Sequence, residues 1–338
     1  MKKWAKENEN MSPKRFGGTL PRLMVSAALP FLLAAQAPQN APAKPDSPEA
    51  AAHVAAAKKI AGTEWAGEAR FFCEAPLATD ANAPMIEPTK IFDNVYAMGR
   101  AATVTYAIAT PDGIIMIDSG YTRDVETILL PAFKKLGLDP TKIKYSIITH
   151  GHADHFGGAF YLQEHFGTRI AMSAEDWDVV LAPPASTKKG EPQPLPRKDM
   201  ILVEGQPVSL GAETVTPVFI PGHTPGSMGL MFPVKDGSKT HVAGLFGGTI
   251  LVAGRIPDEG LQQYLRSIAH FKEKAKEMKV DVELQNHPVY DNMPEKLAQL
   301  SSRKPGAPNP FVVGAANYGK FLDVMAECMR ADIARRAK

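Results

Sequence analysis

Six consecutive residues in the middle of the chain, His150 to His155, bring together side chains that bind metal ions. The segment reads His-Gly-His-Ala-Asp-His, so three of the nine histidines of the chain fall within six positions, together with an aspartate. Imidazole nitrogen and carboxylate oxygen are both ligands of zinc. The small residues Gly151 and Ala153 permit the sharp backbone path that lets alternate side chains converge on one point. The segment therefore predicts a metal site rather than a solvated polar turn.

A strand that ends directly before this segment must position it. Ile143–Thr149 has the apolar pattern of a strand, and Gly158–Phe166 behind the segment has the spacing of a helix. Loops at the carboxyl ends of strands are where α/β sheets place their sites. Further strands and helices follow one another along the chain, which implies mixed sheets with helices on their outer faces. The other predicted strands are Lys90–Met98, Thr103–Ala109, Gly113–Ile117, Met200–Glu204, Glu213–Ile220, Met228–Val234, Thr240–Phe246 and Val280–Gln285, and the other predicted helices are Ala50–Ala61, Thr122–Leu136, Leu261–Met278 and Phe311–Ala337.

The composition limits the class of protein. The 338 residues are 44% hydrophobic and 22% charged, which is typical of a soluble globular protein with an ample core. A formal net charge of +2 provides no field for holding a polyanion, so we expect no nucleic-acid partner. Two cysteines are too few for a disulfide framework or a four-thiolate zinc site. Histidine and carboxylate must therefore carry any metal.

Residues 1–37 have the three parts of a secretory signal peptide. Basic residues precede the apolar run Leu23–Ala35, and Ala35-Gln36-Ala37 reads as a small-x-small cleavage site. The apolar run is shorter than the roughly 20 residues that a membrane span needs. We therefore predict a periplasmic or secreted protein that has no stable membrane association after cleavage.

The segment His150–His155 resembles the signature of the metallo-β-lactamase superfamily. Three further segments resemble motifs of this family, and they occur in the family's order along the chain: Ile117–Gly120, Pro221–Ser227 and Asn286–Pro288. The resemblance covers roughly Glu87–Arg335. It implies an α/β protein with the αβ/βα sandwich of the family, in which two mixed β-sheets are flanked by helices.

The N-terminal composition and the resemblance together predict how the chain is organised. Residues 1–37 are the signal peptide, 38–86 a linker with an N-terminal helical extension, and 87–338 a metallo-β-lactamase-like catalytic domain. An oxidising compartment permits a disulfide between Cys73 and Cys328. The sequence does not show whether these two residues lie close together, so their pairing stays open at this stage.

The resemblance implies two zinc ions (Zn2+) in neighbouring sites. The ligands are His150, His152 and His223 for the first site and Asp154, His155 and His287 for the second. This set resembles the third subclass of class B β-lactamases, whereas the other subclasses replace one of these groups by Asn or Cys. Relatives of the glyoxalase II and acyl-homoserine-lactonase types carry an aspartate that bridges both metals, but Leu245–Thr249 has glycine where that aspartate would lie. Flavodiiron relatives use Glu at the position of His152, so zinc is favoured over iron.

These features predict a zinc-dependent hydrolase that acts on a small-molecule substrate. Zinc lowers the pKa of bound water, and the resulting hydroxide opens an amide or ester bond, with Asp154 as the catalytic residue that orients it. Asp118 is either a support for a ligand histidine or a structural cap at a strand end. We expect a β-lactamase of the third class B subclass, with antibiotic resistance as its role. A non-catalytic metal-binding protein is disfavoured because no ligand is missing, and the oligomeric state stays open.

One departure from the third subclass concerns the substrate. That subclass usually has a Ser-x-Ser pair that helps to hold the β-lactam carboxylate; here Thr249 supplies the first hydroxyl, but Leu251 stands at the second position. The alternative is therefore an exported di-zinc lactonase, esterase or other small-molecule hydrolase of the same fold. Phe156, Met228 and Tyr290 flank the motif segments and are further candidates for binding substrate, with ordinary core packing as the competing interpretation.

The signal-peptide hypothesis predicts that the mature chain begins near Pro38. N-terminal sequencing of the exported protein measures this directly. A soluble cytoplasmic enzyme that keeps Met1 or Met11 at its N-terminus would contradict the hypothesis.

Overall fold

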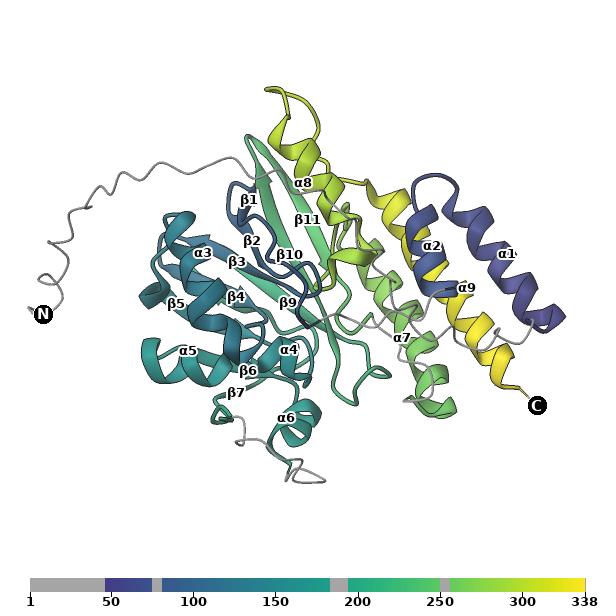
Figure 1. The fold of residues 1–338 in the computed structure, drawn as a ribbon, viewed down its shortest axis with the longest axis horizontal. Helices are drawn as coiled ribbons and strands as arrows, with labels where there is room; N and C mark the ends of the chain where they lie inside the picture. The colour runs from purple at the N-terminus through teal and green to yellow at the C-terminus, as the bar shows by residue number, and fades with distance from the viewer. Residues whose placement is uncertain (1–45, 75–80, 183–193, 250–255, 338) are drawn as a thin grey trace, which may run out of the picture. The chain divides into compact units, whose positions relative to one another are not determined.

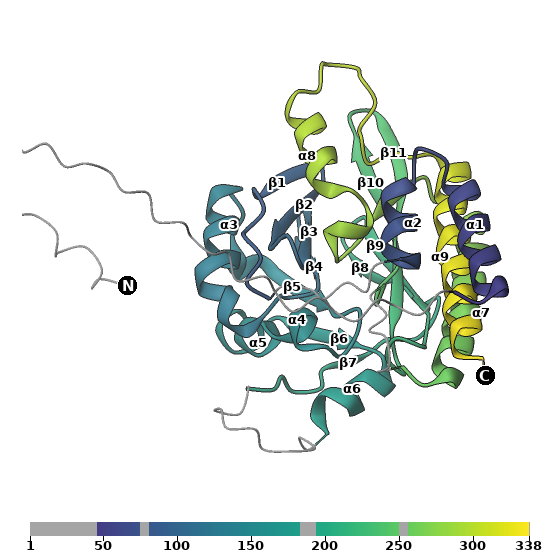
Figure 2. The same ribbon diagram turned by 45° about the vertical axis from the view of Figure 1, so that its right-hand side comes forward.

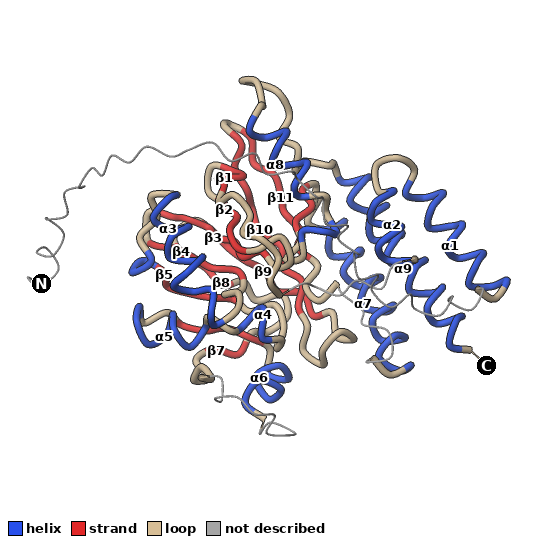
Figure 3. Tube along the Cα trace, viewed as in Figure 1, coloured by secondary structure: helices blue, strands red, loops and turns tan. Residues whose placement is uncertain are grey.

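The computed structural model describes residues 46–74, 81–182, 194–249 and 256–337. Residues Asp46–Lys338 form one compact unit. Two mixed β-sheets lie at the centre of this unit with helices on both outer sides (Figures 1 and 3), which confirms the predicted αβ/βα sandwich. The predicted signal peptide, residues 1–37, lies outside the described residues.

The first sheet has seven strands in the order of the chain. Strands β1 to β4 are antiparallel to their neighbours, whereas β4 to β7 run parallel to one another. The strands are β1 (Thr89–Phe92), β2 (Val95–Gly99), β3 (Val104–Thr110), β4 (Gly113–Ile117), β5 (Ile143–Ile147), β6 (Arg169–Met172) and β7 (Met200–Ile201). The parallel half contains the strand that precedes the histidine-rich segment.

The second sheet has five strands in the order β12-β11-β10-β9-β8. Only the β11–β12 pair is parallel, and the other neighbours are antiparallel. The strands are β8 (Val208–Leu210), β9 (Glu213–Phe219), β10 (Met228–Asp236), β11 (Lys239–Leu245) and β12 (Val282–Leu284).

Helices cover the outer face of each sheet (Figure 2). Helices α3 (Leu130–Lys135) and α5 (Ala159–Phe166) pack on the first sheet, and α7 (Asp258–Glu277) and α9 (Ala315–Arg336) pack on the second. Helices α1 and α2 of the predicted N-terminal extension pack against α9. The remaining helical segments are α1 (Pro48–Ala61), α2 (Ala66–Cys73), α4 (Ala153–Phe156), α6 (Ala174–Leu181), α8 (Met293–Ser301), a π turn at Val125–Leu129 and 3-10 turns at Thr122–Asp124, Pro140–Lys142 and Pro288–Tyr290.

The core follows from the alternation of side chains along the strands. In β4, Ile115 and Ile117 point into the core between the sheets, while Ile114 and Met116 pack against the helices outside. Successive side chains of a strand point to opposite faces, so a strand that is covered on both faces must be apolar throughout. This requirement explains the uninterrupted apolar run Gly113–Ile117.

The structure differs from the sequence prediction at several elements. The predicted helix Phe311–Ala337 begins only at Ala315, because Val312 bridges to Val282 in extended form and Gly314 has a positive φ of 82°. The predicted helix Thr122–Leu136 is divided into a 3-10 turn, a π turn and α3. Elements that the sequence analysis did not identify are α2, α4, α6, α8, β6 and β8. None of the helices within the described ranges is long and apolar enough to span a membrane.

A disulfide between Cys73 and Cys328 decides the question that the sequence left open. It joins the end of α2 to the middle of α9 across 255 residues of chain. Both residues are buried in the core that α1, α2, α7 and α9 share with the outer face of the second sheet. The bond therefore ties the N-terminal extension to the rest of the unit.

Removal of this disulfide is expected to lower the free energy of unfolding by about 2–5 kcal/mol, because a cross-link over a long loop restricts the unfolded chain. The measurement is urea denaturation of the wild type and of the double variant Cys73→Ala with Cys328→Ala, each with and without reductant. Reductant should shift the wild-type midpoint and leave the variant unchanged. An equal midpoint for the oxidised and reduced wild type would contradict the expectation.

Candidate metal centre

The predicted ligands all follow strand ends at one edge of the sandwich. His150 comes after β5, His223 after β9 and His287 after β12. His152 is the residue directly before the short helix α4, which carries Asp154 and His155 in its single turn. The loops therefore bring together the ligands that sequence reasoning placed in one site.

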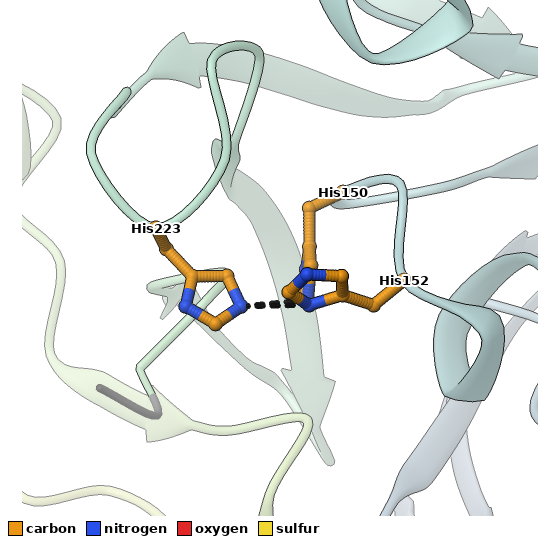
Figure 4. Close-up of side chains that lie close together, drawn as sticks. All are labelled: His150, His152 and His223. Atoms are coloured by element: carbon orange, nitrogen blue, oxygen red, sulfur yellow. Dashed lines mark hydrogen bonds between the residues drawn. The ribbon is translucent and has the colours of Figure 1, made fainter. Parts of the chain in front are cut away.

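The first group consists of His150, His152 and His223 (Figure 4). Its ligand atoms all lie within 4.8 Å of one another. Nε2 of His223 is 3.2 Å from Nε2 of His150 and 3.0 Å from Nδ1 of His152. Zinc–nitrogen bonds of about 2.0–2.1 Å in tetrahedral geometry place two ligand nitrogens roughly 3.3 Å apart. The three imidazoles thus have the spacing that a single zinc ion requires.

The second group consists of Asp154, His155 and His287, whose ligand atoms also lie within 4.8 Å of one another. Nε2 of His155 is 3.4 Å from Oδ2 of Asp154. This Nε2 atom is buried and makes no hydrogen bond of regular geometry with any described residue. A buried nitrogen with a free lone pair beside a carboxylate fits a metal ligand.

Partners outside the two groups fix which nitrogen of each ring is free. Nδ1 of His287 lies 2.8 Å from the carbonyl oxygen of Ala102, and Nδ1 of His155 lies 2.8 Å from Oδ2 of Asp118. Carbonyl and carboxylate oxygens only accept hydrogen bonds, so Nδ1 must carry the hydrogen in both rings. Each ring therefore directs Nε2 into the centre. Metal-ligating histidines characteristically have such partners.

Asp118 connects three strand ends behind the centre. Its buried carboxylate accepts hydrogen bonds from the backbone N–H of Thr149 at 2.8 Å, from the Thr149 hydroxyl at 3.1 Å and from the Asn286 amide at 3.2 Å, in addition to the one from His155. Its φ of 58° lies in the left-handed region, which aspartate tolerates better than most residues. Asp118 therefore serves both of the roles that the sequence suggested, support of a ligand and cap of a strand end.

The protonation states of three of the imidazoles suit metal binding. Burial and the neighbouring imidazoles hold the pKa of His150 and of His223 well below the usual range, and burial with the nearby His155 lowers the pKa of His287 to about 4. These rings are neutral near pH 7, as ligation requires. At His155, burial is outweighed by the carboxylates of Asp154 and Asp118, which raise its pKa to about 10. This ring therefore carries a second proton near pH 7 in the metal-free centre, and a metal ion that binds Nε2 must displace this proton.

Gly247 and Gly248, which follow β11, have no room for a side chain that could supply a bridging carboxylate. A Cβ atom on Gly248 would lie 2.8–2.9 Å from atoms of His223, and this glycine has a φ of 75°. A Cβ atom on Gly247 would lie 2.2 Å from the carbonyl oxygen of Met228. The backbone therefore packs against a ligand at the place where other family types carry the aspartate.

The candidates for substrate contact have different surroundings. Met228 is fully buried between the sheets, and Phe156 packs into a cluster with residues of α6. Tyr290 is buried and stacks on Phe72 of α2, with ring centroids 4.4 Å apart. Thr249 is buried, and its hydroxyl has no hydrogen-bond partner among the described residues. Leu251 lies outside the described residues.

Sequence reasoning missed one polar residue that joins the ligand loops, Asp176 on α6. This residue is fully buried and accepts hydrogen bonds from the loops of both His150 and His223. The sequence did contain a signal for the start of α6, because Ser173-x-x-Asp176 directly after an apolar run is typical of a helix N-terminus.

Comparison with known proteins gives a family match for part of the chain. Residues 98–238 match the family model described as the metallo-beta-lactamase superfamily. This stretch of the chain therefore lies in a metallo-beta-lactamase superfamily domain. Among solved structures, BJP-1, described as a subclass B3 metallo-beta-lactamase of Bradyrhizobium japonicum, is 29% identical with a TM-score of 0.61. The match covers 73% of this chain and 90% of that one.

Two curated relatives have names other than β-lactamase. The chain is 35% identical over 91 residues to a hydroxyacylglutathione hydrolase of Acidiphilium cryptum, which is 27% of this chain and only 31% of that enzyme. It is 27% identical over 256 residues to an atrochrysone carboxyl ACP thioesterase of Aspergillus fumigatus, covering 71% of this chain and 73% of the relative. These relatives are hydrolases, which is the class that the sequence predicted.

The contacts of Asp118 predict that Asp118→Ala lowers the free energy of unfolding of the zinc-free protein by about 3–5 kcal/mol. The substitution leaves several buried donors without an acceptor, and breaking a buried charged pair costs about this much. Urea denaturation measures the change. Asp112→Ala, at the exposed turn before β4, is the matched control and should change stability by less than about 0.5 kcal/mol. A loss of less than 1 kcal/mol for Asp118→Ala would contradict this role.

Proposed function

We propose that the protein is an exported hydrolase that binds two zinc ions and opens β-lactam rings, in the manner of the subclass B3 enzymes it resembles. The observation that carries the proposal is the pair of ligand groups. One consists of histidines only and the other of Asp154 with two histidines, and the described residues directly after β11 include glycines in place of a bridging carboxylate. Six ligands give each ion three protein donors and leave coordination positions for water and substrate.

The chemistry depends on how the chain's residues present the two groups. When bound, two zinc ions supply Lewis acidity and lower the pKa of water to near 7. His152 is exposed and His223 is half-buried, whereas His155 and His287 are buried. His150 is buried as well and Asp154 is half-buried, so we infer that substrate approaches the centre from the side of His152.

Asp154 is the residue we assign to orienting the attacking water. Burial would raise the pKa of its carboxyl, but the positive charge of His155 outweighs burial and lowers the pKa below its usual value. The carboxylate therefore stays ionised. Thr103 donates a hydrogen bond from its hydroxyl to Oδ2 of Asp154 at 3.2 Å, which fixes the carboxylate's orientation. An oriented carboxylate can accept a hydrogen of water and aim its oxygen at a carbonyl carbon.

Export to the periplasm or the exterior is supported by two independent features. Residues 1–37 read as a signal peptide, and the Cys73–Cys328 disulfide is of the kind that persists in oxidising compartments.

Hydrolysis of a lactone, ester or thioester is the second candidate. It is favoured by Leu251, which stands where the third subclass usually has a serine hydroxyl for the β-lactam carboxylate. The similarity to a thioesterase over 256 residues favours it as well. The ligand groups serve this chemistry equally, because the attacked atom is again a carbonyl carbon.

A side-by-side assay separates the two candidates. The zinc-loaded protein is tested against penicillins, cephalosporins and carbapenems, against lactones and thioesters, and against phosphodiesters. The proposal predicts the highest kcat/KM for a β-lactam. A kcat/KM at least tenfold higher for a lactone or thioester would favour the second candidate, and hydrolysis of none of these compounds would contradict both.

Substitution of the ligands tests the assignment of residues in the same assay. His152→Ala and Asp154→Ala should abolish hydrolysis, because enzymatic acceleration of about 10⁶-fold or more depends here on activated water. His270→Ala is the matched control, because this histidine lies on α7, pairs with Glu204 and takes no part in either group. Full activity in His152→Ala would contradict the assignment.

A further inference from the structure

Helix α6 lies directly against both loops that carry the first ligand group. A Cβ atom on Gly226 would lie 2.1 Å from Oγ of Ser173 and 2.7 Å from the backbone nitrogen of Asp176. A Cβ atom on Gly151 would lie 3.2 Å from Val180 and 3.3 Å from Val179. Glycine between the first two ligands and glycine after His223 thus let one helix reach both loops.

The N-terminal turn of α6 places a carboxylate between the two loops. Oγ of Ser173 accepts a hydrogen bond from the backbone N–H of Asp176 at 3.2 Å, which caps the helix. In a capping box the side chain at this position reaches back to the cap residue. The carboxylate of Asp176 points instead to the loops of the metal centre.

Both oxygens of this carboxylate are used. Oδ2 accepts from the backbone N–H of Gly151 at 2.8 Å and from the Thr224 hydroxyl at 2.7 Å, and Oδ1 accepts from the backbone N–H of Gly226 at 2.9 Å. Gly151 lies between His150 and His152, and Thr224 follows His223. One carboxylate therefore fixes the separation of the two loops that carry the three histidines.

We propose that Asp176 is a positioning residue for the first ligand group, and that the zinc affinity of this group, but not that of the second, depends on its carboxylate. Among the described residues, no hydrogen bond joins Asp176 to the second group, whose partners are Thr103, Asp118 and Ala102. Asp118 also holds Thr149, whose hydroxyl lies 3.1 Å from Nδ1 of His150, so Asp176 is the support that belongs to the first group alone. The inference rests on the proposed function only in that the first group binds zinc.

Burial of this carboxylate has an energetic cost that a surface residue would avoid. Asp176 is fully buried, and burial raises its pKa, although the hydrogen bonds from Thr224, Gly151 and Gly226 oppose the shift. An acidic residue in the first turn of a helix interacts favourably with the helix dipole at the surface as well. Capping of α6 alone therefore does not account for a carboxylate in this position.

The replacement Asp176→Asn tests the proposal with little change in shape. An amide has one acceptor oxygen, so in either orientation its NH2 group faces a backbone N–H of one loop. We expect the zinc dissociation constant of the first group to rise about 10- to 100-fold, as is typical when the partner of a ligand is removed. The constant of the second group should stay within about twofold of the wild-type value.

Competition between the protein and a chromophoric zinc chelator gives both dissociation constants. His223→Ala and His287→Ala identify which constant belongs to which group. Asp178→Asn is the matched control, because this aspartate lies on the same helix, is exposed and faces Lys198 at 3.6 Å. Thr224→Val is a milder variant that removes one hydrogen bond of the three and should give a smaller rise of the same constant.

The outcomes separate this inference from the proposed function. A selective rise for Asp176→Asn in a protein that unfolds at the wild-type temperature supports the inference, whatever the substrate is. Unchanged constants, or an equal rise at both groups, would overturn it. If Asp176→Asn does not fold, Thr224→Val decides between the same outcomes. A wild-type protein that binds no zinc would overturn both the inference and the proposed function.

Discussion

The convergence of imidazole lone pairs is the constraint on which the site depends. Five rings direct a nitrogen toward one region, and nitrogens as close as 3.0 Å are stable together only when a cation or shared protons lie between them. A ring that binds a metal must be neutral, and its other nitrogen then carries the hydrogen. For His155 and His287 this N–H has an acceptor, the carboxylate of Asp118 and the carbonyl of Ala102, and both acceptors come from segments other than those that carry the ligands.

The sandwich supplies the rigidity that this arrangement needs. Strands β4, β5 and β12 end at the same edge, and Asp118 links all three ends through Thr149, His155 and Asn286. Because these strands are held between two packed layers, their ends keep a fixed separation. The second sheet adds His223 through the loop between β9 and β10, and α6 connects that loop to the loop after β5. The ligand loops are therefore braced from both sheets.

Much of this could be predicted from the sequence, and the rest depends on contacts that a sequence does not display. The strand Ile143–Thr149 and the dense segment after it identified the sheet edge and four ligands, while His223 and His287 came from the family resemblance. The pairing of Cys73 with Cys328 could be predicted only by placing α2 against α9. The sequence did not reveal α2 because this helix begins without a side-chain cap. Asp176 escaped notice because two of its three partners are backbone N–H groups of glycines, which carry no signal of their own in the sequence. Met228 directly follows the Pro221–Ser227 motif, which suggested a contact with substrate. Its side chain lies instead on the inner face of β10 and is buried in the core between the sheets.

The central claim is that the two ligand groups are separate zinc sites within one centre. Anomalous X-ray diffraction at the zinc absorption edge, from crystals of the protein purified with zinc, tests it most directly. We expect two peaks per chain, about 3.5–4 Å apart. One peak should lie among His150, His152 and His223, and the other among Asp154, His155 and His287. A single peak at full zinc saturation, or peaks outside these two groups, would contradict it.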